Sequence, residues 1–195
     1  MPPSPERVLS LARESRELQR GFFEAHAADV ARAAERMEKA LREGGKILLF
    51  GNGGSAADCQ HFAAELVGTF ERKDRRGLAA LALTTDTSAL TSIANDTDYA
   101  HVFSRQIEAL GRAGDVALGI STSGDSPSVL EGLKKARAMG LATMALLGRD
   151  GGRAAPLADA TLVVPGTSAA RIQETHAVVI HVLCALIEER IEEKI

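Results

Sequence analysis

The sequence predicts an α/β fold in which a doubly wound, five-stranded parallel sheet of the flavodoxin type follows N-terminal helices. Beyond about residue 46, short apolar runs alternate with amphipathic stretches, and a polar turn follows each run. Strands that read as continuous apolar runs are typical of a parallel sheet covered by helices on both faces. The expected strands are residues 46–50, 78–84, 115–121, 141–147 and 161–164.

Helices are expected at both ends of the chain. Alanine, leucine, arginine and glutamate dominate from Ser4 to about Lys46, where Ser4 suits an N-cap and Pro5 the first helical position. We expect Gly21 to divide this stretch into two helices. The last segment, residues 168–193, is apolar along one face and charged at its end, as a closing helix would be.

Composition and charge exclude several classes of protein. The chain has 195 residues, of which 45% are hydrophobic, which is enough for one substantial core. A net charge of -3 with interspersed signs gives no basic face, so nucleic acid is disfavoured as the main ligand. Cys59 and Cys184 do not form the dense disulfide framework of a small secreted domain. Without a secretory pattern or a run of about 18 apolar residues, we expect a cytoplasmic protein with no membrane partner.

Two loops that follow strands are the candidate ligand site. Residues 51–55, GNGGS, follow the first strand, and residues 121–127, STSGDSP, follow the third and lead into a helix that Pro127 opens. Hydroxyls, free N–H groups and the positive end of a helix dipole together satisfy a phosphate monoester without a lysine. If the strand order is 2-1-3-4-5, both loops flank the switch point, where ligands bind in open parallel sheets.

Each loop also has a simpler interpretation. The first lacks both the GxGxxG pattern and the lysine of a nucleotide-binding loop, so by itself it is equally well a plain turn. In the second, Ser126 or Ser128 would cap the helix, Ser128 with Glu131 as a capping box. The two loops together favour an anion site.

Four further side chains are candidate ligands for a metal or a sugar. His61 and Glu65 stand four residues apart, so on a helix they project from one face, although such pairs are more often solvated than ligating. His181 lies in an apolar stretch, where a buried core histidine is the alternative. Gln173 is eight residues earlier, about 12 Å along an ideal helix. For both to reach one ion, Gln173 must lie in an irregular first turn, or the two must come from different subunits.

Several motifs in order resemble the sugar isomerase (SIS) domain family, and within it the phosphoheptose isomerases. The resemblance covers about residues 44–191 and is carried by GNGGSAADCQHFAAEL, IANDTDYAHVFSRQIEALGRAGDV, GISTSGDSPSV, GRDGG and RIQETHAVVIH. It implies one compact unit, with residues 1–43 as a helical segment on the core and at the subunit interface and residues 44–195 as the SIS domain. It also implies a homotetramer.

The resemblance also implies the site residues. It assigns zinc, one divalent ion per subunit, to His61, Glu65, Gln173 and His181. It assigns substrate contacts to Asn52, Gly53, Gly54, Ser55, Glu65, Asn95, Asp96, Ser121, Thr122, Ser123, Ser126 and Gln173. These donor types suit zinc without excluding other divalent ions.

The implied reaction converts sedoheptulose 7-phosphate to D-glycero-D-manno-heptose 7-phosphate through an enediol, the first step of nucleotide-activated heptose synthesis for glycoconjugates such as lipopolysaccharide. Glu65 is expected to move the proton between carbons and His181 between oxygens. The alternatives are a non-catalytic SIS-fold adaptor that binds a replication initiator, a sugar-phosphate sensor, and an isomerase of five- or six-carbon sugars. Glu65 and His181 together favour an enzyme over the adaptor.

Overall fold

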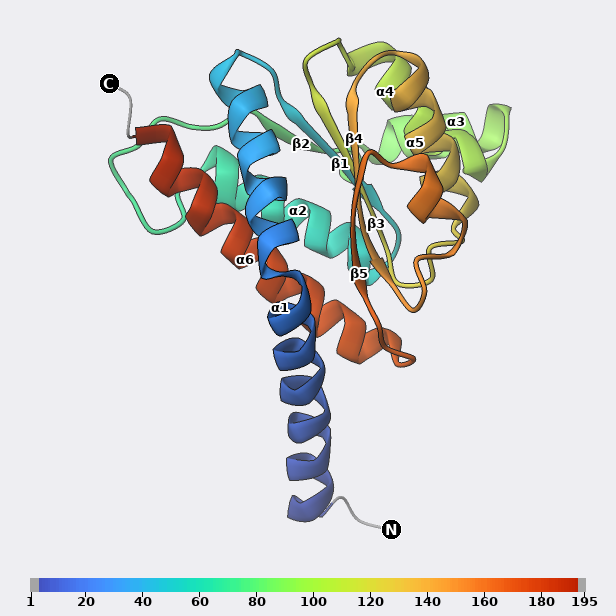
Figure 1. Cartoon of the computed structure of the whole chain (residues 1–195). Helices are drawn as coiled ribbons and strands as arrows, with labels where there is room; N and C mark the ends of the chain where they lie inside the picture. The colour runs from blue at the N-terminus through green and yellow to red at the C-terminus, as the bar shows by residue number, and fades with distance from the viewer. Residues whose placement is uncertain (1–3, 193–195) are drawn as a thin grey trace.

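The computed structural model describes residues 4–192 and contains one five-stranded sheet in the order β2-β1-β3-β4-β5 (Figure 1). Every neighbouring pair of strands is parallel. The predicted doubly wound sheet and its strand order are therefore confirmed, although β2 is shorter than the predicted strand at 78–84. The strands are β1 (Ile47–Gly51), β2 (Ala80–Ala82), β3 (Val116–Ser121), β4 (Ala142–Gly148) and β5 (Ala160–Val164).

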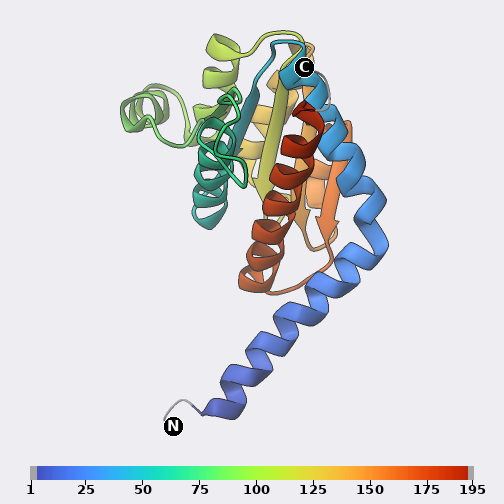
Figure 2. The same ribbon diagram turned by 90° about the vertical axis from the view of Figure 1, so that its left-hand side faces the viewer.

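Helices cover both faces of the sheet, as Figures 1 and 2 show. One apolar cluster joins α1, α2 and α6 to one face, and a second joins α3, α4 and α5 to the other. The α-helices are α1 (Pro5–Arg42), α2 (Gly54–Val67), α3 (Thr87–Asp96), α4 (Val102–Leu110), α5 (Pro127–Ala138) and α6 (Ala169–Glu192). Two 3₁₀ turns, η1 (Tyr99–His101) and η2 (Gly152–Leu157), complete the described chain.

The interior strand β1, between β2 and β3, contributes apolar side chains to both faces of the sheet. Ile47 and Leu49 belong to the cluster beneath α1, α2 and α6, whereas Leu48 and Phe50 belong to the opposite cluster. Successive strand residues point to opposite faces, so a strand buried on both sides must be apolar throughout. Removing a fully buried side chain as large as Phe50 would cost about 3–5 kcal/mol.

The N-terminal helix α1 is a single helix. Ser4 caps it by accepting a hydrogen bond from the backbone N–H of Arg7, and Pro5 takes the first helical position, as predicted. The predicted division at Gly21 is wrong, because a glycine lowers helix propensity by only about 1 kcal/mol and the helix continues through it. The buried residues of α1 begin at Phe22, and the N-terminal end of the helix projects beyond the rest of the described chain (Figure 2).

The C-terminal helix α6 packs against α1 and α2, beside the sheet. Among the described residues it is the one helix long and apolar enough to cross a membrane, by length and composition alone. Its apolar side chains Ile172, Val179 and Ile180 are buried in the cluster that joins it to the sheet. Its hydrophobicity is therefore that of a core helix.

His176 joins α6 to the end of β4. Its Nε2–H donates to the backbone carbonyl of Leu147 over 3.0 Å, whereas Nδ1 is buried and has no hydrogen-bond partner among the described residues. Since a carbonyl only accepts, Nε2 carries the proton of a neutral ring. Burial lowers the pKa of His176 from 6.5 to about 4, despite the hydrogen bond to Leu147.

Protonation of His176 should therefore destabilise the fold in acid. The unfolded chain takes up this proton near pH 6.5 and the folded chain only near pH 4. The stabilisation is complete above pH 6.5 and is lost as the pH falls to 4, by about 3 kcal/mol. His176→Gln keeps an N–H donor but does not titrate. Between pH 7 and pH 4, we expect its free energy of unfolding, measured in urea, to fall by about 3 kcal/mol less than that of the parent. Equal losses in the variant and the parent would contradict this.

Candidate functional site

The two predicted loops meet at the switch point of the sheet. β1 and β3 are neighbours, but β1 leads into α2 on one face and β3 into α5 on the other. Asn52, in the first loop, donates from Nδ2 to the hydroxyls of Ser126 and Ser128 over 2.8 and 2.9 Å. The expectation that both loops flank the switch point is confirmed.

The second loop presents hydroxyl groups as donors. The Oγ of Ser121 accepts from the backbone N–H of Gly124, and the Oγ of Ser123 accepts from that of Asp125, each over 3.1 Å. A hydroxyl that accepts in this way keeps its own proton to donate. Gly124 adopts a φ of +70° close to Gly151, where no side chain would fit. The loop can thus direct several O–H groups toward an anion.

The capping interpretation of this loop is wrong in its details. Ser126 occupies the N-cap position of α5 and Pro127 its first position, but the Ser126 side chain makes no capping hydrogen bond. Ser128 lies inside the helix, and its hydroxyl accepts from Asn52. Glu131 pairs with Lys134 instead. The serine side chains therefore connect the two loops and do not form a capping box.

His61 and Glu65 on α2 lie beside His181 on α6. The Nε2 atoms of the two histidines are 3.1 Å apart, and Nε2 of His61 is 3.3 Å from Oε1 of Glu65. The ring of Phe70 stacks on that of His181, with their centroids 5.7 Å apart. The structure therefore brings together three side chains that lie up to 120 residues apart in sequence.

These side chains have donor types and two spacings that suit zinc. Ligands about 2.0–2.1 Å from a tetrahedral ion lie about 3.3 Å from one another, close to both distances at His61. In residues 4–192, however, no three His, Cys, Asp or Glu side chains are already arranged to hold a metal ion. Burial raises the pKa of Cys184, one turn after His181, to about 12, so its thiol remains protonated.

Gln173 lies against the start of α2. A Cβ atom at Gly54 would be only 2.4 Å from Nε2 of Gln173. Since α6 is helical from Ala169, Gln173 does not lie in the irregular first turn that we considered. Regular helix separates it from His181 by about 12 Å along the axis. Its predicted role as a ligand of the same ion therefore depends on a second subunit.

The remaining predicted substrate residues differ in burial and in their place in the fold. Ser55 is buried in the first turn of α2, beside Gly53 and Gly54. Asn95 and Asp96 are exposed at the end of α3, where they hydrogen-bond to each other. Asp96 lines a separate surface hollow between α3, α4 and α5. Their contact with substrate, like that of Thr122, stays a prediction.

Two side chains at this site were not predicted. The Tyr99 hydroxyl donates to Oδ1 of Asn52 over 2.9 Å and so orients its amide toward the serines. Asp58 lies one turn before His61, and its Oδ2 is buried without a hydrogen-bond partner among the described residues. Burial raises the pKa of Asp58 to about 6, against the opposing effect of His61. The three-residue spacing from His61 was the signal in the sequence for Asp58.

Comparison with known proteins identifies the family. The SIS domain model matches residues 11–148, most of the chain. The chain belongs to the SIS domain family and, within it, to the phosphoheptose isomerases. It is 51% identical over 189 residues to the phosphoheptose isomerase of Aquifex aeolicus, covering 97% of this chain and 98% of that protein.

Solved structures of phosphoheptose isomerases have the same fold as this chain. The phosphoheptose isomerase of Neisseria gonorrhoeae is 49% identical, with a TM-score of 0.89 over 94% of this chain and 98% of its own. That of Francisella tularensis is 33% identical, with a TM-score of 0.93 over 97% of this chain and all of its own. The chain is thus a sugar-phosphate isomerase of the SIS fold, and the adaptor alternative is not favoured.

Proposed function

We propose that this protein converts sedoheptulose 7-phosphate to D-glycero-D-manno-heptose 7-phosphate, the first step of nucleotide-activated heptose synthesis. The observation that carries the proposal is that Glu65 and His61 on α2 lie beside His181 on α6. The first candidate ligand loop leads directly into α2. The choice of a seven-carbon substrate rests on the phosphoheptose isomerases, one of which is 51% identical to this protein over 97% of the chain. Acid–base groups and an anion loop are the parts that such a reaction requires.

The acid–base groups suit an enediol pathway. Isomerisation takes a proton from the carbon beside the carbonyl, returns one to its neighbour, and moves another between two oxygens. We assign the carbon steps to the carboxylate of Glu65 and the oxygen steps to the imidazole of His181. Positioned groups of this kind each contribute roughly 10²–10⁴-fold to the rate.

Zinc is the metal that these donors would hold. The nitrogens of His61 and His181 and the carboxylate of Glu65 supply three ligands, and Gln173 of a second subunit would supply the fourth. Zinc, when bound, supplies a Lewis acid that favours the negative charge developing on the sugar oxygens. His61 would only hold the ion, whereas Glu65 and His181 would hold it and also carry the protons.

The loop at residues 121–126 holds the phosphate in this proposal. Ser121, Thr122, Ser123 and Ser126 would donate to the phosphate oxygens, with Asn52 fixing Ser126. Binding the phosphate far from the reacting carbons converts binding energy into their orientation. Asn95 and Asp96 would reach the sugar hydroxyls by a movement of α3 or from another subunit.

We further propose that the enzyme is a cytoplasmic homotetramer. The projecting half of α1 exposes Val8 and Leu9, at 62% and 54%, which suits burial against further copies of the chain. Light scattering should give the mass of four chains, and a monomeric mass would contradict the assembly.

Glu65→Gln should lower kcat by at least about 100-fold and leave substrate binding nearly unchanged, because the amide keeps the shape of the side chain but cannot accept the proton. NMR would follow both conversion of sedoheptulose 7-phosphate and exchange of its C1 protons with deuterated water. Glu131→Gln, on α5, where the carboxylate pairs with Lys134, is the matched control and should turn over normally. Normal turnover or C1 exchange in Glu65→Gln would remove Glu65 as the base.

Gly54→Ala should lower kcat/KM by about 10- to 100-fold without loss of stability, because the added methyl displaces the Gln173 amide and leaves the helix intact. Gly21→Ala is the control, since a methyl there meets nothing within 4 Å. Thermal unfolding and steady-state kinetics would be measured for both. Parental kinetics in Gly54→Ala would show that the position of Gln173 does not matter for activity.

A further inference from the structure

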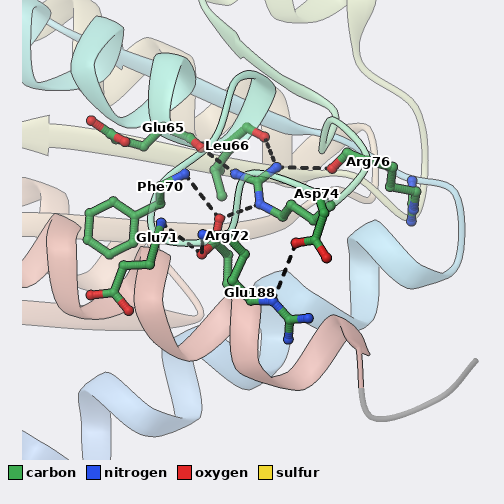
Figure 3. A network of polar contacts seen from close by, with 9 residues as sticks. Glu65, Leu66, Phe70, Glu71, Arg72, Asp74, Arg76 and Glu188 are labelled. Atoms are coloured by element: carbon green, nitrogen blue, oxygen red, sulfur yellow. Dashed lines mark hydrogen bonds and ion pairs between the residues drawn. The ribbon is translucent and has the colours of Figure 1, made fainter.

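A buried ion pair joins an otherwise exposed loop to α6, beside the side chains to which we assign proton transfer. The loop connects α2 to β2, and most of residues 68–77 are exposed. Nevertheless the side chains of Arg75, in this loop, and Glu188, on α6, are only 1% and 2% exposed and form an ion pair (Figure 3). Burying two charges costs several kcal/mol per ion, so such a pair is poor evidence for stabilisation alone.

Arg75 caps the C-terminal end of α2. Its Nη1 donates to the carbonyl of Leu66 over 2.8 Å, and its Nη2 donates to that of Glu65 over 2.5 Å. The last carbonyls of a helix have no partner within the helix, and a planar guanidinium can satisfy two of them at once. The backbone of Glu65 is therefore held directly by Arg75.

Glu188 holds the other side of the loop. Its Oε1 accepts from the backbone N–H of Phe70, and its Oε2 accepts from those of Glu71 and Arg72, over 3.0 to 3.2 Å (Figure 3). Burial would raise the pKa of Glu188, but the Arg75 guanidinium and the three N–H groups outweigh it and keep the pKa below its ordinary value. The carboxylate thus fixes the backbone at Phe70, whose ring stacks on His181.

The position of Glu188 on α6 connects these contacts to the reaction. It follows His181 by seven residues, two helical turns, and so lies on nearly the same face of the helix. Arg75 therefore contacts the backbone of Glu65, and Glu188 contacts the backbone of Phe70, whose ring packs on His181. The ion pair thus reaches Glu65 directly through its backbone and His181 through Phe70.

We propose that Arg75 and Glu188 are positioning residues that set the spacing between Glu65 on α2 and His181 on α6. The kinetic test of this proposal rests on the function proposed above. The placement of the His181 ring can be tested without turnover.

The first test compares two buried carboxylates. Asp115 is 3% exposed, accepts from the backbone N–H of Lys46 and Arg112, and pairs with the Lys46 side chain over 2.6 Å. The partners of its side chain, Lys46 and Arg112, lie just before β1 and β3, outside α2 and α6. Asp115→Asn therefore imposes a comparable loss of charge and hydrogen bonding outside the contacts that join Arg75 and Glu188 to Glu65 and Phe70.

In folded Glu188→Gln we expect kcat to fall about 10- to 100-fold with KM changed less than about twofold, the usual cost of disturbing a supporting residue. Its His181 ring resonances should shift in the metal-free protein as the Phe70 ring moves. Asp115→Asn should lose stability but retain the parental kcat and His181 resonances. A folded Glu188→Gln with parental kcat and His181 resonances would overturn the proposal.

Arg75→Lys distinguishes a positioning role from simple compensation of the Glu188 charge. It also provides the test if Glu188→Gln does not fold. A lysine keeps a positive charge beside Glu188 but cannot reproduce the guanidinium contacts to Leu66 and Glu65. We expect its kcat to fall about tenfold or more at nearly parental stability, whereas parental kcat and His181 resonances would overturn the proposal. If the parent itself does not turn over sedoheptulose 7-phosphate, the proposed function fails, and the His181 resonances of these variants still decide the positioning role.

Discussion

The parallel packing of α2 against α6 is the constraint on which the site depends. Contacts between the two helices follow one another in order: Gly54 meets Gln173, His61 meets His181, and the end of α2 reaches Glu188 through Arg75. Seven residues on α2 and eight on α6 separate the first two contacts, so the helices advance together. A slip of one residue would rotate His61 by about 100° away from His181.

The sheet explains why this helix pair lies beside the proposed phosphate loop. α2 begins at the carboxyl end of β1, and α5 begins at that of β3, on the opposite face. Their first turns therefore diverge to opposite faces of the sheet, and Asn52 joins the two loops by its hydrogen bonds to Ser126 and Ser128. The same topology thus positions both the loop to which we assign the phosphate and the start of the helix that carries His61 and Glu65.

The fold was largely predictable because a strand buried on both faces has no polar positions to obscure its apolar run. The division at Gly21 was wrong because a single glycine weakens a helix without ending it. The proximity of His61 and Glu65 followed from helical spacing, but that of His181 depended on the resemblance, since packing between α2 and α6 leaves no local pattern. Arg75 and Glu188 were missed for the same reason, because a loop arginine gains its partners only through tertiary structure.

The central claim is that Glu65 and His181, assisted by a metal, isomerise a phosphorylated ketose. The most direct measurement is NMR of sedoheptulose 7-phosphate incubated with zinc-loaded protein and with protein stripped by a chelator. Conversion to D-glycero-D-manno-heptose 7-phosphate by the zinc-loaded sample, lost on stripping and restored by zinc, is the predicted result. Absence of conversion in both samples would contradict the isomerase, and equal conversion in both would contradict the role of the metal.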